Sequence, residues 1–199
     1  MVLKRGILVG AGLAILLVGT CAVSGTSLLP PGVALGPCLK DWTSPTSYQR
    51  RASPLATVRG TVGPARVEVC YGRPSARGRT VFGKLVPYDS LWRAGANEPT
   101  RLYTDQTITL AGITLQPGRY SLYAIPRPDS WTVFVSRSVL HWGNDISPGV
   151  RAQEVGSARV PVEPLETPVE TLTVTLQRDT LAFAWERTRV TLPIAPVGG

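Results

Sequence analysis

The chain has 199 residues, which is enough for one domain of ordinary size. Hydrophobic residues make up 43% of it and charged residues 17%, a balance that excludes an intrinsically disordered chain and indicates a globular protein with a buried core. Most of the formal net charge of +8 lies in one stretch, because residues 50–101 hold ten basic against three acidic side chains. Such a stretch attracts phosphate, carboxylate or an anionic polymer, unless it is merely a solvated arginine-rich face.

The first residues have the pattern of an export signal. Lys4 and Arg5 precede an unbroken apolar run at residues 6–19, which is short for a membrane span of about 20 residues. Two processing routes are compatible with this pattern, cleavage before Gly25 or lipid attachment at Cys21, and an uncleaved membrane anchor is the third alternative. We therefore predict a signal peptide or membrane anchor at residues 1–24 and a periplasmic or cell-surface location, with the membrane contacted through the N-terminus only. For an exported chain we expect no nucleic-acid partner.

A segment rich in proline and glycine follows, without apolar periodicity, and predicts a tether at residues 25–52 before a domain at residues 53–199. Once Cys21 is cleaved off or lipidated, Cys38 and Cys70 remain as an even pair. In an oxidising compartment they can form a disulfide, and the alternative is two unrelated thiols.

Within the domain the signals are those of short strands. Residues 65–71 alternate with period two, which places Val67, Val69 and Tyr71 on one face. Similar patterns recur along the chain, with a turn at residues 116–118 and a hairpin tip at residues 178–179; they cover residues 101–110, 119–125, 131–135, 158–162, 171–176, 181–185 and 189–192. One short helix is expected around residues 90–93. The predicted fold is all-β, a single antiparallel β-sandwich or jelly-roll-like barrel with at most one or two short helices.

Two runs between residues 71 and 100 are dense in arginine, glycine and aromatic residues. They resemble the signature of a bacterial exported family known as domain of unknown function 2911; the matching residues are Tyr71-Gly72-Arg73-Pro74-Ser75, Gly78-Arg79, Phe82-Gly83, Leu85-Val86-Pro87, Trp92-Arg93, Gly95-Ala96-Asn97-Glu98 and Thr100. Arg77 stands where the family has lysine, which keeps the charge. The resemblance extends over about residues 53–176. It implies a β-rich fold and export, and it implies no activity.

The chemistry of these runs suggests a binding site. Three guanidinium groups, on Arg73, Arg79 and Arg93, are suited to hold a carboxylate or phosphate through paired hydrogen bonds. The candidate ligand-binding residues are Tyr71, Arg73, Ser75, Arg79, Trp92, Arg93, Asn97 and Glu98. In the alternative interpretation, Arg93 and Glu98 form a buried ion pair that fixes two loops. The aromatic residues are either a stacking platform for sugar rings or, more commonly for their spacing, part of the core.

Catalytic and metal-binding patterns are not recognisable in the sequence. The chain has a single histidine, His141, and neither Ser75 nor Cys70 lies in the sequence context of a catalytic nucleophile. The glycine spacing fits neither a dinucleotide nor a phosphate-binding loop, and the side chains do not match a zinc or calcium site. The sequence thus predicts no cofactor and no metal.

We therefore expect an exported cell-envelope protein, a non-catalytic module that binds an anionic small molecule or glycan at the arginine-rich loops. A hydrolase that uses Glu98 as general acid or base, with Asn97 orienting the substrate, is the first alternative. A purely structural envelope protein is the second. The sequence does not indicate an oligomeric state.

Overall fold

The strands form where apolar and polar residues alternate. In β2 (Ala65–Gly72), Val67, Val69 and Tyr71 are buried as predicted. On the other face Arg66 is exposed and Glu68 is partly buried, whereas Cys70 is buried. A computed structural model describes Cys38 and residues 51–198, which all belong to one compact unit of the chain. The other strands are β1 (Leu55–Val62), β3 (Thr100–Thr104), β4 (Ile108–Leu110), β5 (Ile113–Leu115), β6 (Gly118–Pro126), β7 (Ser130–Ser136), β8 (Glu154–Gln177) and β9 (Thr180–Pro196).

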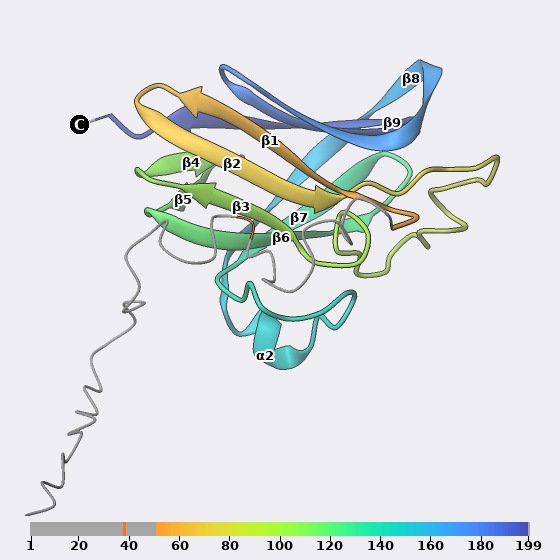
Figure 1. The fold of residues 1–199 in the computed structure, drawn as a ribbon, viewed down its shortest axis with the longest axis horizontal. Coiled ribbons are helices and arrows are strands. Elements are labelled where there is room, and N and C mark those ends of the chain that lie inside the picture. Colours follow the sequence, from red (N-terminus) through yellow and green to blue (C-terminus); the bar gives the residue numbers. More distant parts are fainter. Residues whose placement is uncertain (1–37, 39–50, 199) are drawn as a thin grey trace, which may run out of the picture. The chain divides into compact units, whose positions relative to one another are not determined.

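All neighbouring strands pair in antiparallel fashion, in the order β1-β2-β3-β6-β7-β8-β9-β4-β5. The sheet curls so that the far end of the β8–β9 hairpin lies along β1, where Gly60 packs against Leu176 (Figure 1). The core lies between these layers; its fully buried members include Val69, Leu102, Leu122, Leu172, Leu181 and Leu192. The prediction of an all-β, sandwich-like antiparallel fold is confirmed.

The β8–β9 hairpin is long and interrupted. Its pairing shifts register between Pro164 and Val169 and again between Val169 and Thr173, because β8 carries extra residues there. On β9, Glu186 adopts a left-handed φ of 53° at the same level. These irregularities divide the hairpin into a proximal half, residues 154–164 with 187–196, and a distal half, residues 171–177 with 180–186. The sequence patterns at residues 158–162 and 171–176 are the two halves of one strand.

A smaller apolar cluster covers the outer side of β6 and β7. Tyr123 stacks on Phe134 with ring centroids 5.3 Å apart, and Ile146 and Val150 pack against them. Val150 belongs to α2 (Pro148–Arg151), the one short helix among the described residues, which lies below β6 and β7 in Figure 1. No helix in the described part of the chain is long and apolar enough to cross a membrane.

Two local predictions need correction. The helix expected around residues 90–93 does not form, because Asp89 and Ala94 have left-handed φ values of 57° and 52° and Trp92 pairs instead with Ala124 through two 2.8 Å backbone hydrogen bonds. The strand expected at residues 101–110 is broken by a turn, after which β4 pairs with β9. No pattern in the sequence predicted β1 or β5.

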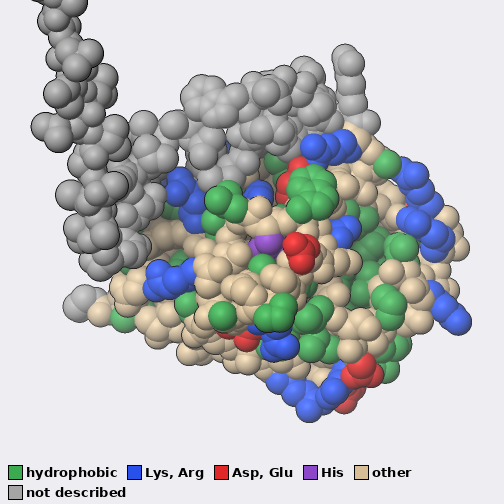
Figure 2. Space-filling model, turned by 90° about the horizontal axis from the view of Figure 1, so that it is seen from below, with side chains coloured by type: hydrophobic (Ala, Val, Ile, Leu, Met, Phe, Trp, Pro, Cys, Tyr) green, Lys and Arg blue, Asp and Glu red, His purple; other side chains and the backbone are tan. Residues whose placement is uncertain are grey.

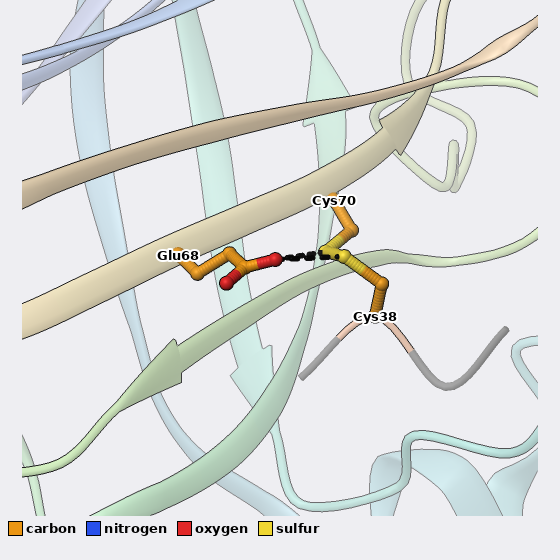
Figure 3. A group of neighbouring side chains, drawn as sticks. All are labelled: Cys38, Glu68 and Cys70. Carbon is orange, nitrogen blue, oxygen red and sulfur yellow. Dashed lines mark hydrogen bonds between the residues drawn. A yellow bond between two sulfur atoms is a disulfide. The ribbon is translucent and has the colours of Figure 1, made fainter. Parts of the chain in front are cut away.

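Cys38 and Cys70 form a disulfide, one of the two alternatives that the sequence left open, and it ties the segment before the domain to β2 (Figure 3). The signal or anchor predicted at residues 1–24 lies outside the described residues. So does the predicted tether at residues 25–52, apart from Cys38 and the last two residues.

Candidate functional site

The segment between β2 and β3, residues 73–99, carries most of the signature and is here called the signature loop. Its apolar side chains close one end of the core. Phe82 lies between three tryptophans, with ring centroids 5.8 Å from Trp92, 5.2 Å from Trp131 and 6.1 Å from Trp185. Tyr71 is also buried, and its hydroxyl accepts a hydrogen bond from the Val174 amide at 3.0 Å. These aromatic residues are core residues, so they form no exposed platform for sugar rings.

Two glycines let the loop approach the sheet closely. A Cβ atom on Gly72 would lie 2.0 Å from the Ala96 carbonyl oxygen, and one on Gly95 would lie 2.8 Å from Thr100 Oγ1. The Trp92 indole donates to the Gly95 carbonyl at 3.1 Å, which locks the same turn. Much of the signature is therefore explained by the packing of this loop.

The first part of the loop binds to β8. The Ser75 hydroxyl lies 2.9 Å from the Thr171 hydroxyl, and the Arg73 guanidinium donates to the Leu172 carbonyl at 3.3 Å and to Thr173 Oγ1 at 3.4 Å. Arg79 is exposed and donates to the carbonyls of Ala76 and Ser75 at 2.8 and 2.9 Å. Both guanidinium groups thus donate hydrogen bonds within the domain. Arg73 binds β8, whereas Arg79 binds carbonyls of its own loop.

The last part of the loop holds a buried charge. Glu98 is 6% exposed, and one of its oxygens forms an ion pair with Arg51. Its other oxygen, Oε2, and the Nε of Arg93 are both buried without a hydrogen-bond partner among the described residues. Burial lowers the pKa of the half-buried Arg93, and the negative charge of Glu98 partly offsets this effect. Asn97, at a left-handed φ of 62°, donates to the Ser53 carbonyl.

The predicted site residues therefore fall into two groups. Arg73 and Ser75 lie against β8, with Arg79 bonded beside them, whereas Arg93, Asn97 and Glu98 lie at the other end of the loop, where the Arg93 amide donates to Asn144 Oδ1. Tyr71 and Trp92 are buried between these groups in the core. Over the face drawn in Figure 2, side chains of both charges are spread out, so this face has no single cationic patch.

A recess lies on the β8–β9 hairpin, away from the core face of its strands. Its volume is about 350 Å³, and both halves of the hairpin line it. The lining is mostly short and polar: Glu163, Val169, Thr173, Thr175, Gln177, Thr180, Ala182, Ala184, Arg189 and Thr191. Glu163 and Arg189 face each other in the strand register without forming an ion pair. Arg73 does not line the recess but donates a hydrogen bond to Thr173, which does.

The recess was not predicted from the sequence, although the alternation in residues 171–177 carries a signal for it. Leu172 and Val174 face the core, and the residues between them are Thr171, Thr173 and Thr175, a row of hydroxyls on the opposite face. A row of threonines alone is also typical of an ordinary solvent-facing strand. Only the interrupted pairing of β8 with β9 brings both halves of the hairpin to the same recess.

Comparison with protein-family models gives a match over residues 53–194 to the family described as protein of unknown function (DUF2911). No curated protein and no solved structure matches the chain. The matched region covers the strands from β1 into β9 and includes the whole signature loop and both halves of the hairpin. The chain therefore belongs to the DUF2911 family of proteins of unknown function.

Proposed function

We propose that the domain is a binding module for a small anionic ligand, held in the recess of the β8–β9 hairpin. The observation that carries the proposal is Arg189, which lines this recess and forms no ion pair with any described residue. A volume of about 350 Å³ is within the range of small-molecule sites, which is roughly 300–1,000 Å³.

The lining matches an anion that carries additional polar groups. The guanidinium of Arg189 can donate two parallel hydrogen bonds to a carboxylate or phosphate. The hydroxyls of Thr175, Thr180 and Thr191 can donate to the remaining ligand oxygens. Glu163, opposite Arg189, accepts hydrogen bonds and repels a second negative charge, so it favours a ligand with an amine or hydroxyl next to its anionic group.

The same lining favours an anion over a neutral glycan. Sugar rings are commonly held by stacking on aromatic side chains, and no aromatic residue lines the recess. Tyr71, Trp92 and Trp131 are buried in the core, as described above. The arginine-rich loops contribute through Arg73, which can reach the ligand next to Thr173, whereas Arg79 and Arg93 have other contacts.

The first alternative, a hydrolase with Glu98 as acid or base, has weaker support. A general acid or base must reach the substrate, and Glu98 is buried, ion-paired with Arg51 and not part of the recess lining. Its position favours a structural role.

The proposed location is outside the cytoplasm. The Cys38–Cys70 disulfide supports it, because structural disulfides form and persist mainly in oxidising compartments. We expect mass spectrometry of the mature protein to find an N-terminus at Gly25, or a lipid-modified Cys21 at the N-terminus. An unprocessed chain that remains in the soluble cytoplasmic fraction with free thiols would contradict export.

Arg189→Ala is expected to weaken binding of an anion about tenfold or more, since a hydrogen bond to a charged group contributes about 1.5–3 kcal/mol. The mature protein is titrated calorimetrically with inorganic phosphate and with the amino acid serine, which combines a carboxylate with an amine and a hydroxyl. Maltose serves as the neutral glycan.

The matched control is Arg178→Ala. Arg178 is exposed at the tip of the same hairpin and does not line the recess, so this variant loses the same charge at a nearby position. The proposal requires that Arg178→Ala bind like the unmodified protein. Equal losses in both variants would indicate non-specific attraction to the basic surface, and binding of maltose alone would favour the glycan.

A further inference from the structure

Three side chains with metal-ligand chemistry converge at the disulfide. The ligand atoms of Cys38, Glu68 and Cys70 all lie within 4.8 Å of one another. Glu68 Oε1 is 3.0 Å from Cys38 Sγ and 3.8 Å from Cys70 Sγ, and Figure 3 shows its carboxylate directed at the two sulfurs. The Thr57 hydroxyl lies 3.5 Å from Cys38 Sγ. A disulfide sulfur has neither a proton to donate nor a negative charge, so the oxidised group is a poor metal ligand.

We propose that the reduced form of this protein binds a soft divalent cation, with Zn²⁺ as the best match, through Cys38, Cys70 and Glu68. A dithiol reductant supplies two electrons and two protons, which break the Cys38–Cys70 bond and give two thiols while the reductant becomes a disulfide. The two thiols then release their protons as they bind the metal. Two thiolates and one carboxylate are a ligand set that zinc accepts, and water takes the fourth position.

The surroundings compensate the charge of such a site. Two thiolates, one carboxylate and Zn²⁺ together carry one negative charge. Arg59 already donates to both oxygens of Glu68, at 3.0 and 2.9 Å, and the guanidinium of Arg101 donates to the Cys38 carbonyl at 3.3 Å. Each carboxylate oxygen has a second lone pair, so Arg59 can orient Glu68 while the free lone pair binds the metal.

Glu68 has two neighbours, its cross-strand ion-pair partner Arg59 and the Cys38–Cys70 disulfide. Arg59 holds the carboxylate from β1, and one oxygen also points at a disulfide that offers it no proton (Figure 3). Reduction places the carboxylate next to two thiols. When the thiols release their protons, a bound cation removes the repulsion among the three negative groups. Metal binding and the disulfide therefore exclude each other. The reduced form holds the metal through its thiolates, and oxidation to the disulfide releases the metal.

The test uses the full chain with Cys21→Ser in every sample, so that Cys38 and Cys70 are the only thiols. The chain is reduced with a phosphine, which does not bind the metal as a thiol would, and is titrated with Co²⁺ without oxygen. We expect the absorption bands of thiolate-bound Co²⁺ in the reduced chain, their loss on addition of Zn²⁺, and no bands in the oxidised chain. Glu68→Gln should weaken Co²⁺ binding at least about tenfold, while Glu166→Gln, at an exposed carboxylate far along the chain, should not.

Near-ultraviolet circular dichroism of the tryptophan cluster reports whether each reduced sample is still folded. A reduced chain that keeps this signal but shows no thiolate–Co²⁺ bands overturns the proposal. Equal Co²⁺ affinity in Glu68→Gln and the reference chain overturns the role of the carboxylate. Binding that is seen only after the tryptophan signal is lost overturns the proposed site, because the site then does not require the fold.

Discussion

Phe82→Ala is expected to lower the free energy of unfolding by about 3–5 kcal/mol, a large share of the stability of an ordinary domain. The ring of Phe82 is 7% exposed and meets Trp92 and Trp185 edge-on, with interplanar angles of 80° and 83°. Removing it deletes the centre of the aromatic cluster. The cavity cannot close easily, because the surrounding indoles belong to the loop, to β7 and to β9.

Equilibrium unfolding in urea, followed by tryptophan fluorescence, measures this effect. Leu85→Ala is the matched control, because Leu85 belongs to the same loop but is 41% exposed, and it should cost less than about 1 kcal/mol. A loss below about 1 kcal/mol for Phe82→Ala would contradict our assignment of the loop as part of the core. The Trp92–Trp131 contact, at 5.4 Å between centroids, would then have to hold the loop without Phe82.

The alternation of apolar residues predicted most of the sheet, because a strand buried on one face leaves a period of two in its sequence. The clearest example is β2, where Val67, Val69 and Tyr71 are buried. Strand β1 was missed because its burial depends on what covers it: Gly60 and Arg59 do not look like strand residues, and they pair with Val67 and Glu68 of β2. The helix expected at residues 90–93 failed because Trp92 forms backbone hydrogen bonds with β6, a contact that depends on the tertiary structure.

The candidate site could be predicted only in part. Sequence proximity grouped Arg73, Arg79 and Arg93, but proximity along a loop does not fix where long side chains point. In the structure Arg79 turns back to carbonyls of its own loop, and Arg73 reaches across to β8. For a disulfide the sequence offered one pair, Cys38 and Cys70, but it left open whether these two thiols join, which the structure shows.

The recess was not predictable, because it depends on where β8 carries its extra residues. A regular hairpin would pair Pro164 and Thr173 with residues farther apart on β9, whereas the observed register brings Glu186 opposite Val169. The Glu186 side chain also accepts a hydrogen bond from the Val81 amide at 2.9 Å, which joins this bend to the signature loop. The loop, the bend and the recess are therefore parts of one packing arrangement.

Glu98→Ala is expected to destabilise the protein by about 1–3 kcal/mol, because the buried Glu98 carboxylate offsets the desolvation of the half-buried Arg93. Glu98 is ion-paired with Arg51, and its charge acts on Arg93, whose Nε is buried without a hydrogen-bond partner. Without the carboxylate, the half-buried guanidinium of Arg93 still carries the free-energy cost of its desolvation and loses the attraction that offsets this cost. The surface variant Glu166→Ala should change the stability by less than about 0.5 kcal/mol.

The decisive measurement is a double-variant cycle with Arg93→Met, which keeps most of the apolar stem of the side chain and removes the charge. If the two charges stabilise each other, Glu98→Ala should cost less in the Arg93→Met background, by about 1–3 kcal/mol.

A hydrolase would behave differently, because a proton-transfer group is held at some expense in stability, and Glu98→Ala would then leave the stability unchanged or raise it while abolishing turnover. Additive effects in the cycle would contradict the coupling of Arg93 and Glu98. A stabilised Glu98→Ala variant would restore the carboxylate as a candidate for chemistry. A large, coupled loss instead assigns this end of the signature loop to folding, and leaves the recess beside Arg73 as the place to look for the ligand.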